Sequence, residues 1–374
     1  MTSRAVRRRR AVFALGAALL GLVIAARCAG EPSLLERVPL VGRGTSTAPF
    51  SDRLLVYGRH GLTPDQVAAL RAAASGPFTA VYAGEVAVAS GRADYPEVPV
   101  LTFTADPGSY AAAAATPSLR TALKRGLVLS TTGAALRKAG VGGSVRLADG
   151  RSIQVTAVVS DKVLGGYEMA TSAAVLGHPA APDAAYLLVG SRSSARALRA
   201  ALPGIDLRVE ARTANGIMSS ADTTLTQAQT VKEFGEFAVR VEGGHLRLDP
   251  DWRARWITST SLPQLGVITC NKAVIPALRA AMVEITQRGL GSLVHTADFQ
   301  REGGCWNPRV ERFAAGAISA HAWGIAVDIN VDDNPLGSTP KQDPRLVAIM
   351  AAHGFAWGGD FLRPDGAHFQ WNLP

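Results

Sequence analysis

The sequence of 374 residues predicts an α+β fold built from two folded regions. Its length suits two domains, at roughly 100 to 200 residues for each. Residues 52–212 hold two β-α-β patterns separated by a β-rich insertion, which is typical of a ferredoxin-like α+β domain. Residues 221–374 alternate helical patterns with short strands, so a second mixed region is expected there.

Composition excludes several classes of protein. With 47% hydrophobic and 18% charged residues, the chain is too apolar for a disordered protein and too polar for one with many membrane spans. The net charge of +9 is concentrated at the N-terminus, and without the five arginines found there the rest of the chain carries only +4. This distribution gives no indication of nucleic-acid binding. The five are Arg4, Arg7, Arg8, Arg9 and Arg10.

An uninterrupted apolar run at residues 11–26 follows these arginines and ends at Arg27. Its length lies between the apolar core of a signal peptide and a spanning helix of roughly 20 residues. Signal-peptide cleavage needs small residues at the positions before the cut, and Arg27 would occupy one of them. We therefore favour an uncleaved anchor over a signal peptide or a lipid anchor at Cys28. Residues 1–30 are then the anchor and 31–51 a linker. The positive-inside rule places the remainder outside the cytoplasm, tethered to the membrane or secreted.

The exported part of the chain contains two cysteines, Cys270 and Cys305. In an oxidising compartment the two can form one disulfide, for which loop closure predicts a stabilisation of roughly 3 to 4 kcal/mol. The alternative is a pair of unpaired buried thiols.

The elements of residues 52–212 follow from local signals. Thr63 and Pro64 supply an N-cap and a first-turn proline, so a helix should begin there. Asp149-Gly150 between two apolar runs is a strong hairpin signal. We expect strands at 54–57, 78–89, 185–190 and 205–211, helices at 63–74 and 193–202, and a hairpin over 143–159.

Within this region, the pattern of residues 126–159 resembles the extracytoplasmic domains of ABC-transporter permeases. No cluster of histidines, cysteines or acids occurs in residues 52–212. We therefore interpret the region as one that positions the rest of the chain or binds another envelope protein.

Two helices are expected in the C-terminal region, at residues 221–235 and 271–288, each ending at a glycine. The second helix has an apolar face, which predicts packing against a sheet and no chemistry. The residues of that face are Val274, Leu278, Ala281, Met282 and Ile285.

The chemistry is expected in SAHAWGIAVDIN at 319–330 and in GFAWGGDFLRPDGAHFQW at 354–371. A catalytic zinc site needs three imidazole or carboxylate ligands, an open position for water and a nearby base that is not a ligand. His321, Asp328 and His368 can be the ligands of one Zn²⁺ per chain, with Asp365 as the base. Residues three apart on a straight strand face opposite sides, so Asp365 needs a bend, which Gly366 can provide.

These residues fill the pattern S-x-H-x-x-G-x-A-x-D followed by an acid-x-x-His. The sequence over about 221–374 is similar to the zinc peptidases of the D-alanyl-D-alanine carboxypeptidase and L-alanyl-D-glutamate peptidase family, which cut the stem peptides of bacterial cell-wall peptidoglycan. The resemblance implies a zinc peptidase domain with a small antiparallel sheet and flanking helices. The pattern is carried by Ser319, His321, Gly324, Ala326, Asp328, Asp365 and His368.

The resemblance also implies roles for individual residues. Arg309, in GGCWNPR at 303–309, matches a position that contacts substrate. Ser319 would hydrogen-bond substrate or shape the loop. The aspartate base, where many relatives have glutamate, is similar to that of phage endolysin peptidases and favours the endopeptidase subgroup. His295 could support the site from outside its ligand set.

The sequence therefore predicts a zinc metallopeptidase acting on peptidoglycan stem peptides, with no nucleic-acid partner. Endopeptidase and carboxypeptidase activities use the same ligands and stay open. The alternative is a zinc-stabilised envelope scaffold or peptidoglycan-binding protein without catalysis, which would have no need of a base at Asp365.

Overall fold

The computed structural model describes most of the chain from residue 53 onward. The predicted anchor at 1–30, linker at 31–51 and membrane-proximal Cys28 lie outside the described residues. No helix within the described stretches combines the length and apolar character that a membrane crossing requires. These stretches are residues 53–58, 61–211, 225–242, 245–295, 304–309, 318–361 and 364–372.

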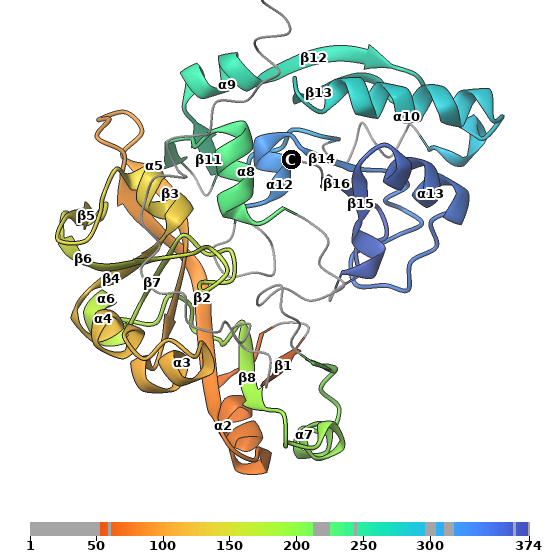
Figure 1. The fold of residues 1–374 in the computed structure, drawn as a ribbon. Helices are drawn as coiled ribbons and strands as arrows, with labels where there is room; N and C mark the ends of the chain where they lie inside the picture. Colours follow the sequence, from red (N-terminus) through yellow and green to blue (C-terminus); the bar gives the residue numbers. More distant parts are fainter. Residues whose placement is uncertain are drawn as a thin grey trace, which may run out of the picture. The chain divides into compact units, whose positions relative to one another are not determined.

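The first half of the chain has the ferredoxin-like core that the sequence predicts. Its strands follow the order β9-β1-β8-β2, and all neighbours are antiparallel. Helices α2 and α7 contact one another and share a buried apolar cluster with this part of the sheet (Figure 1). Thr63 is the N-cap of α2, as its sequence signal predicts, and the structure adds a capping box with Gln66. The bounds are β1 Arg53–Gly58, α2 Pro64–Ala73, β2 Phe78–Ala89, β8 Tyr186–Gly190, α7 Ala195–Ala201 and β9 Leu207–Ala211.

The predicted β-rich insertion lies between β2 and β8 and extends the same sheet in the order β5-β6-β4-β7-β3. The predicted hairpin is present, because β5 pairs antiparallel with β6 and Gly150 turns the chain at φ +91°. The bounds are β3 Glu97–Ala105, α3 Pro107–Ala113, α4 Leu119–Arg125, β4 Leu127–Ser130, α5 Thr131–Arg137, β5 Ser144–Arg146, β6 Ser152–Val159, β7 Met169–Thr171 and α6 Ala173–Leu176.

The second half contains a three-stranded antiparallel sheet, β14-β16-β15, with helices beside it, so the predicted α+β class is confirmed. A two-stranded hairpin, β12-β13, was not expected from the sequence. The bounds are α8 Gln227–Phe234, β10 Val239–Glu242, β11 His245–Leu248, α9 Pro250–Trp256, β12 Ile257–Leu262, β13 Gly266–Asn271, α10 Ile275–Gln287, η2 Gly291–Leu293, α12 Ala320–Trp323, β14 Ala326–Asp328, α13 Pro344–Ala352, β15 Phe355–Trp357, η3 Gly358–Asp360 and β16 His368–Trp371.

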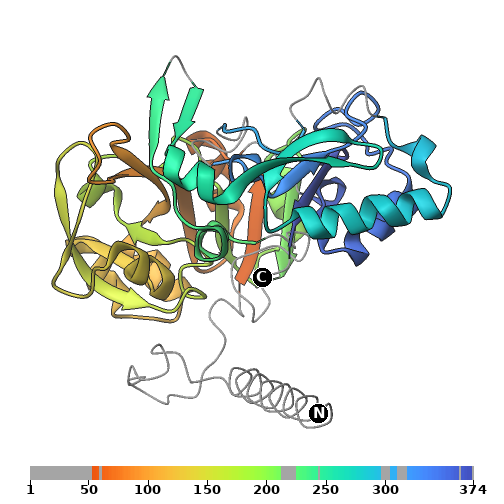
Figure 2. The same cartoon turned by 90° about the horizontal axis from the view of Figure 1, so that it is seen from above.

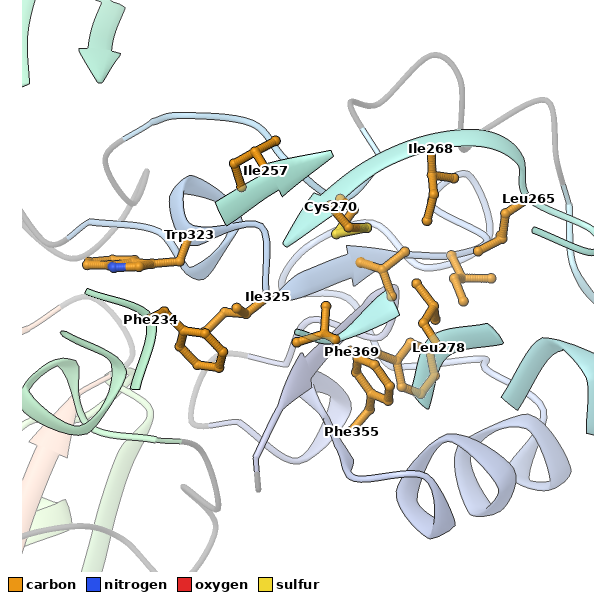
Figure 3. Packing of buried hydrophobic residues seen from close by; sticks show 14 of the residues in the cluster. Phe234, Ile257, Leu265, Ile268, Cys270, Leu278, Trp323, Ile325, Phe355 and Phe369 are labelled. Carbon is orange, nitrogen blue, oxygen red and sulfur yellow. A yellow bond between two sulfur atoms is a disulfide. The ribbon is translucent and has the colours of Figure 1, made fainter. Parts of the chain in front are cut away.

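Helix α10 buries the apolar face that its periodicity predicts, including Leu278 and Met282, neither of which is exposed to solvent. Figure 3 shows Leu278 beside Phe355 and Phe369 of the three-stranded sheet, and Cys270 in the same packed layer. This core supports β14 and β16, the two strands that carry the candidate site residues.

Several contacts join the two halves. Hairpin β10-β11 pairs with β3 through Val239 and Glu97, and Figure 2 shows the two green-cyan strands of this hairpin next to the strands of the first half. Arg137 of α5 forms a partly buried ion pair with Glu236. Thr47–Pro374 form one compact unit. The domain boundary predicted between residues 212 and 221 falls outside the described stretches and stays a prediction.

Candidate metal centre and active site

His321 is placed by a four-residue helix with a defined start and stop. Ser319 is the N-cap of α12, and its hydroxyl accepts the N–H of His321 at 3.4 Å. The Ser319 N–H in turn donates to the carbonyl of Arg309 at 3.1 Å. Ser319 is fully buried, so the structure gives it a loop-shaping position. A contact between Ser319 and substrate stays a prediction.

Gly324 ends this helix in the left-handed conformation, with φ +67°. A Cβ atom there would lie 2.8 Å from the Asn271 nitrogen and 3.1 Å from Ile257 Cδ1. The close approach is needed because the Asn271 N–H donates to the Gly324 carbonyl at 2.9 Å. Glycine therefore lets the chain after His321 turn back against β13.

We expect Gly324→Ala to lower the free energy of unfolding by about 1 to 3 kcal/mol more than Gly289→Ala does. Gly289 has a nearly identical φ of +69° with no atom within 4 Å of its added Cβ, so it carries the backbone strain without the clash. Urea unfolding of the two variants measures the difference. Equal losses would show that the contact with Asn271 relaxes freely.

Strand register brings the other two predicted ligands together. Asp328 of β14 and His368 of β16 lie directly opposite one another in the antiparallel pair. Directly opposed residues place their side chains on the same face, with Cβ atoms about 5 Å apart. Ala326 pairs with Gln370 two residues along the same face. The sheet thus presents Asp328, His368 and Gln370 together.

The three predicted ligands converge on one point. His321 Nε2 lies 3.1 Å from Asp328 Oδ1 and 3.2 Å from His368 Nδ1, and those last two atoms are 3.0 Å apart. In a tetrahedral site with zinc about 2.0 to 2.1 Å from its nitrogen and oxygen ligands, the ligand atoms lie roughly 3.3 Å apart. The spacing of the three side chains therefore fits a zinc ion.

The outer hydrogen bonds of the two imidazoles agree with this fit. His321 Nδ1 lies 2.9 Å from the Cys305 carbonyl oxygen, and His368 Nε2 lies 3.3 Å from Gln370 Oε1. Each of these nitrogens faces an acceptor, which assigns the N–H to it and leaves a lone pair on the nitrogen that faces the cluster. The lone pairs of the two imidazoles and of the Asp328 carboxylate then point toward one another, and a bound cation would be coordinated by all three.

The electrostatics of Asp328 favour the same chemistry. Burial alone would raise the pKa of the Asp328 carboxyl, but the neighbouring imidazoles of His321 and His368 together outweigh burial and hold this pKa well below its usual range. The carboxyl is therefore ionised and available as a ligand. Arg309 lies at the edge of the cluster, with Nη2 3.9 Å from Asp328 Oδ2.

Asp365 lies on the turn that leads into β16. Its N–H donates to the Gly358 carbonyl at 2.8 Å, and its carbonyl accepts the His368 N–H at 3.1 Å, which closes the bend that the sequence requires. A Cβ at Gly366 would lie 2.7 Å from Asn334 Oδ1, so this bend needs a glycine. The backbone thus fixes Asp365 three residues before His368. Its role as a base stays a prediction.

The disulfide between Cys270 and Cys305 is present, with 5.3 Å between the two Cα atoms. It joins β13 to the segment 304–309. That segment holds α12 through three hydrogen bonds, because Cys305 supplies the acceptor for His321, Asn307 N–H donates to the His321 carbonyl, and Trp306 Nε1 donates to the Ala322 carbonyl. The cross-link therefore supports the orientation of His321.

Two neighbours of the cluster were not predicted as site residues. Gln370 shares a face with His368, and this period of two could have identified it. Glu85 reaches the site segment from β2, where Oε1 accepts the Ile318 N–H at 3.1 Å. The local signal for Glu85 is a single acid in an otherwise apolar strand. His295 is exposed and pairs with Asp333 at 3.1 Å, away from the cluster.

Burial, with a smaller contribution from Glu168, raises the pKa of Glu85 from 4.5 to about 8. Between these values the folded chain binds more protons than the unfolded chain, so the free energy of unfolding should fall as pH rises through this window. We expect Glu85→Gln to flatten that fall between pH 5 and pH 8, as measured by urea unfolding. Part of the slope should remain, because burial also raises the pKa of Glu168 to about 7. If the free energy of unfolding of Glu85→Gln depended on pH as that of the unsubstituted chain does, the titration of Glu85 would not be the cause of the fall.

The C-terminal segment that contains this cluster is similar to a known protein family. A family model described as D-alanyl-D-alanine carboxypeptidase matches residues 313–371. The predicted resemblance to this peptidase family is confirmed. The match supports a peptidase of the D-alanyl-D-alanine carboxypeptidase type, and it spans all three clustered residues and Asp365. Arg309 and both cysteines precede the matched segment. No curated protein matches the chain.

Two solved structures are similar to part of the chain. A domain of a permease protein from Porphyromonas gingivalis is 14% identical, with a TM-score of 0.32, and the match covers 46% of this chain and 95% of that one. The periplasmic region of MacB from Actinobacillus actinomycetemcomitans is 10% identical, with a TM-score of 0.32 and coverage of 44% and 90%.

Proposed function

We propose that this protein is a zinc-dependent peptidase that hydrolyses peptide bonds in the stem peptides of bacterial peptidoglycan. The observation that carries the proposal is the convergence of the donor atoms of His321, Asp328 and His368, each within 3.2 Å of the next. A zinc peptidase needs such a ligand cluster together with a base and a group that binds substrate. Asp365 and Arg309 are the residues of this chain that fit those two tasks.

His321, Asp328 and His368 would hold the ion. When bound, zinc supplies a Lewis acid and lowers the pKa of a water molecule at its open position toward about 7. Asp365 accepts the proton of the attacking water and delivers it to the leaving amine nitrogen. Arg309 holds a carboxylate or carbonyl of the substrate with its planar guanidinium. The hydrogen bonds to Cys305 and Gln370 keep both imidazoles oriented throughout.

The proposal places this chemistry outside the cytoplasm. A disulfide between Cys270 and Cys305 suits an oxidising compartment, and the arginine-rich apolar N-terminus suits export, with retention in the membrane through residues 11–26. Residues 52–212 then position the peptidase or bind another envelope protein.

Mass spectrometry of purified muropeptides after incubation with the full chain and zinc tests the proposal. Loss of one terminal D-alanine would identify a carboxypeptidase. Release of the stem after its first L-alanine would identify the endopeptidase that the aspartate base favours. Intact muropeptides in the presence of one bound zinc per chain would contradict the proposed activity and support a non-catalytic scaffold.

A further inference from the structure

A cavity of about 580 Å³ opens next to the segment that supports His321. Four parts of the chain form it: the loop between β2 and β3, hairpin β10-β11, helix α9 and the segment 304–309. We refer to it as the arginine groove. Its polar and aromatic lining comprises Tyr95, Arg240, Arg247, Arg253, Trp306 and Asn307.

The lining of the arginine groove is cationic. It contains three arginines and no acidic side chain. Glu242 lies 3.5 Å from Arg240 and 3.3 Å from Arg247, so one carboxylate is shared by two guanidinium groups. Arg253 has no acidic partner in the stretches that the structure describes. The groove therefore has unbalanced positive charge.

Aromatic rings hold the guanidinium groups in place. The Arg253 guanidinium lies 4.7 Å from the centre of the Trp306 ring, and that of Arg240 lies 5.6 Å from the centre of the Tyr95 ring. A guanidinium stacked on a ring keeps its N–H edges free for a second partner. Planar forks held in this way suit the bidentate binding of carboxylates.

The arginine groove shares the segment 304–309 with the candidate metal centre. Trp306 and Asn307 line the groove and also bond to the carbonyls of Ala322 and His321, at 3.0 Å in each case. Two residues further along the same segment, Arg309 lies beside Asp328. A peptide strand that contacts Arg309 can therefore continue along this segment into the groove.

We propose that the arginine groove is an extended substrate subsite that binds free carboxylates of an acidic peptide at a distance from the scissile bond. This inference rests on the proposed function and deepens it, because it assigns part of the substrate preference to residues before the matched segment 313–371. Arg253 is the principal anchor, since it has a ring partner and no competing acid among the described residues.

The experiment compares Arg253→Ala with Arg255→Ala in the full chain carrying Asp365→Asn and loaded with zinc. Both arginines are exposed residues of α9 and both lie over a tryptophan, but Arg255 lines a different cavity. The probe is fluorescein-labelled L-alanyl-γ-D-glutamyl-L-lysine, and its partner is the same peptide with the C-terminal carboxylate amidated. Fluorescence anisotropy gives Kd without requiring turnover.

Arg253→Ala should raise Kd for the acidic peptide about 10-fold, and Arg255→Ala should leave it within about 2-fold. Amidation of the peptide should weaken binding to the Arg253-containing chain by a similar factor and have little further effect in Arg253→Ala. Equal affinities of the two arginine variants would overturn the proposal. So would competition by poly(glycerol phosphate) with no preference for the carboxylate peptide, which would indicate a phosphate-binding groove.

Turnover of the same peptides, in chains with Asp365 intact, separates the two proposals. Arg253→Ala should raise KM with little change in kcat. Carboxylate-dependent binding with no cleavage of this peptide would contradict the endopeptidase and leave the groove in place. Cleavage with an unchanged Kd and KM in Arg253→Ala would contradict the groove and leave the peptidase in place.

Discussion

Asp365→Asn is expected to lower kcat for muropeptide cleavage by about 10³-fold, because general acid-base catalysis by one side chain contributes typically 10² to 10⁴. Asparagine keeps the shape of the side chain and cannot take a proton from water. The backbone bonds of Asp365 to Gly358 and His368 do not involve its carboxyl group and should persist. Zinc content should therefore stay at one per chain, as measured by atomic emission on the dialysed protein.

Asp360→Asn is the matched control, since Asp360 is an exposed acid of η3 five residues earlier in the chain. It should retain activity within about 2-fold, as surface substitutions usually do. An Asp365→Asn variant as active as this control would remove Asp365 from the proposed mechanism. A variant that lost zinc together with activity would assign Asp365 to the ligand set.

His368→Ala is expected to abolish zinc binding at micromolar metal and to eliminate detectable turnover. The substitution removes one of three converging donor atoms, so only His321 and Asp328 of the proposed ligand set would remain. Metal binding also stabilises the fold, and the thermal shift that zinc gives to the unsubstituted chain should disappear in this variant. Equilibrium dialysis and a thermal melt with and without zinc measure the two effects.

His353→Ala is the control for His368→Ala. His353 ends helix α13 and bonds to Glu284 at 2.8 Å, so its loss should leave the zinc-induced shift unchanged. Gln370→Ala should lower zinc affinity about 10- to 100-fold, which is less than His368→Ala and more than His353→Ala, because it removes the acceptor that orients His368. Full zinc stoichiometry in His368→Ala would exclude His368 as a ligand.

Local signals in the sequence were sufficient for several elements of the ferredoxin-like core and its β-rich insertion. Thr63 and Asp149-Gly150 act through neighbours a few residues away, so the N-cap and the hairpin could be predicted. Pairing between distant strands has no such signal. Hairpin β12-β13 was missed although its two strands are adjacent in sequence, because the polar run of ITSTSL hides its alternation.

The candidate site shows the same division. The motifs identify His321, Asp328 and His368 by residue type and spacing, but their convergence depends on the register that sets Asp328 opposite His368, 40 residues later. The contact between Glu85 and Ile318 joins residues 233 positions apart. Residue spacing in the sequence cannot predict this contact, because the fold of the first half determines where β2 lies relative to Ile318.

The orientation of His321 in the candidate metal centre depends on oxidation of Cys270 and Cys305. In a reducing compartment both cysteines are thiols, and the segment that supplies the acceptor for His321 Nδ1 is held to β13 by hydrogen bonds alone. Closing the bond fixes that acceptor and with it the imidazole. Under the proposed function, oxidation would precede tight metal binding, and the peptidase would bind zinc most weakly where it is synthesised and most tightly where disulfides form.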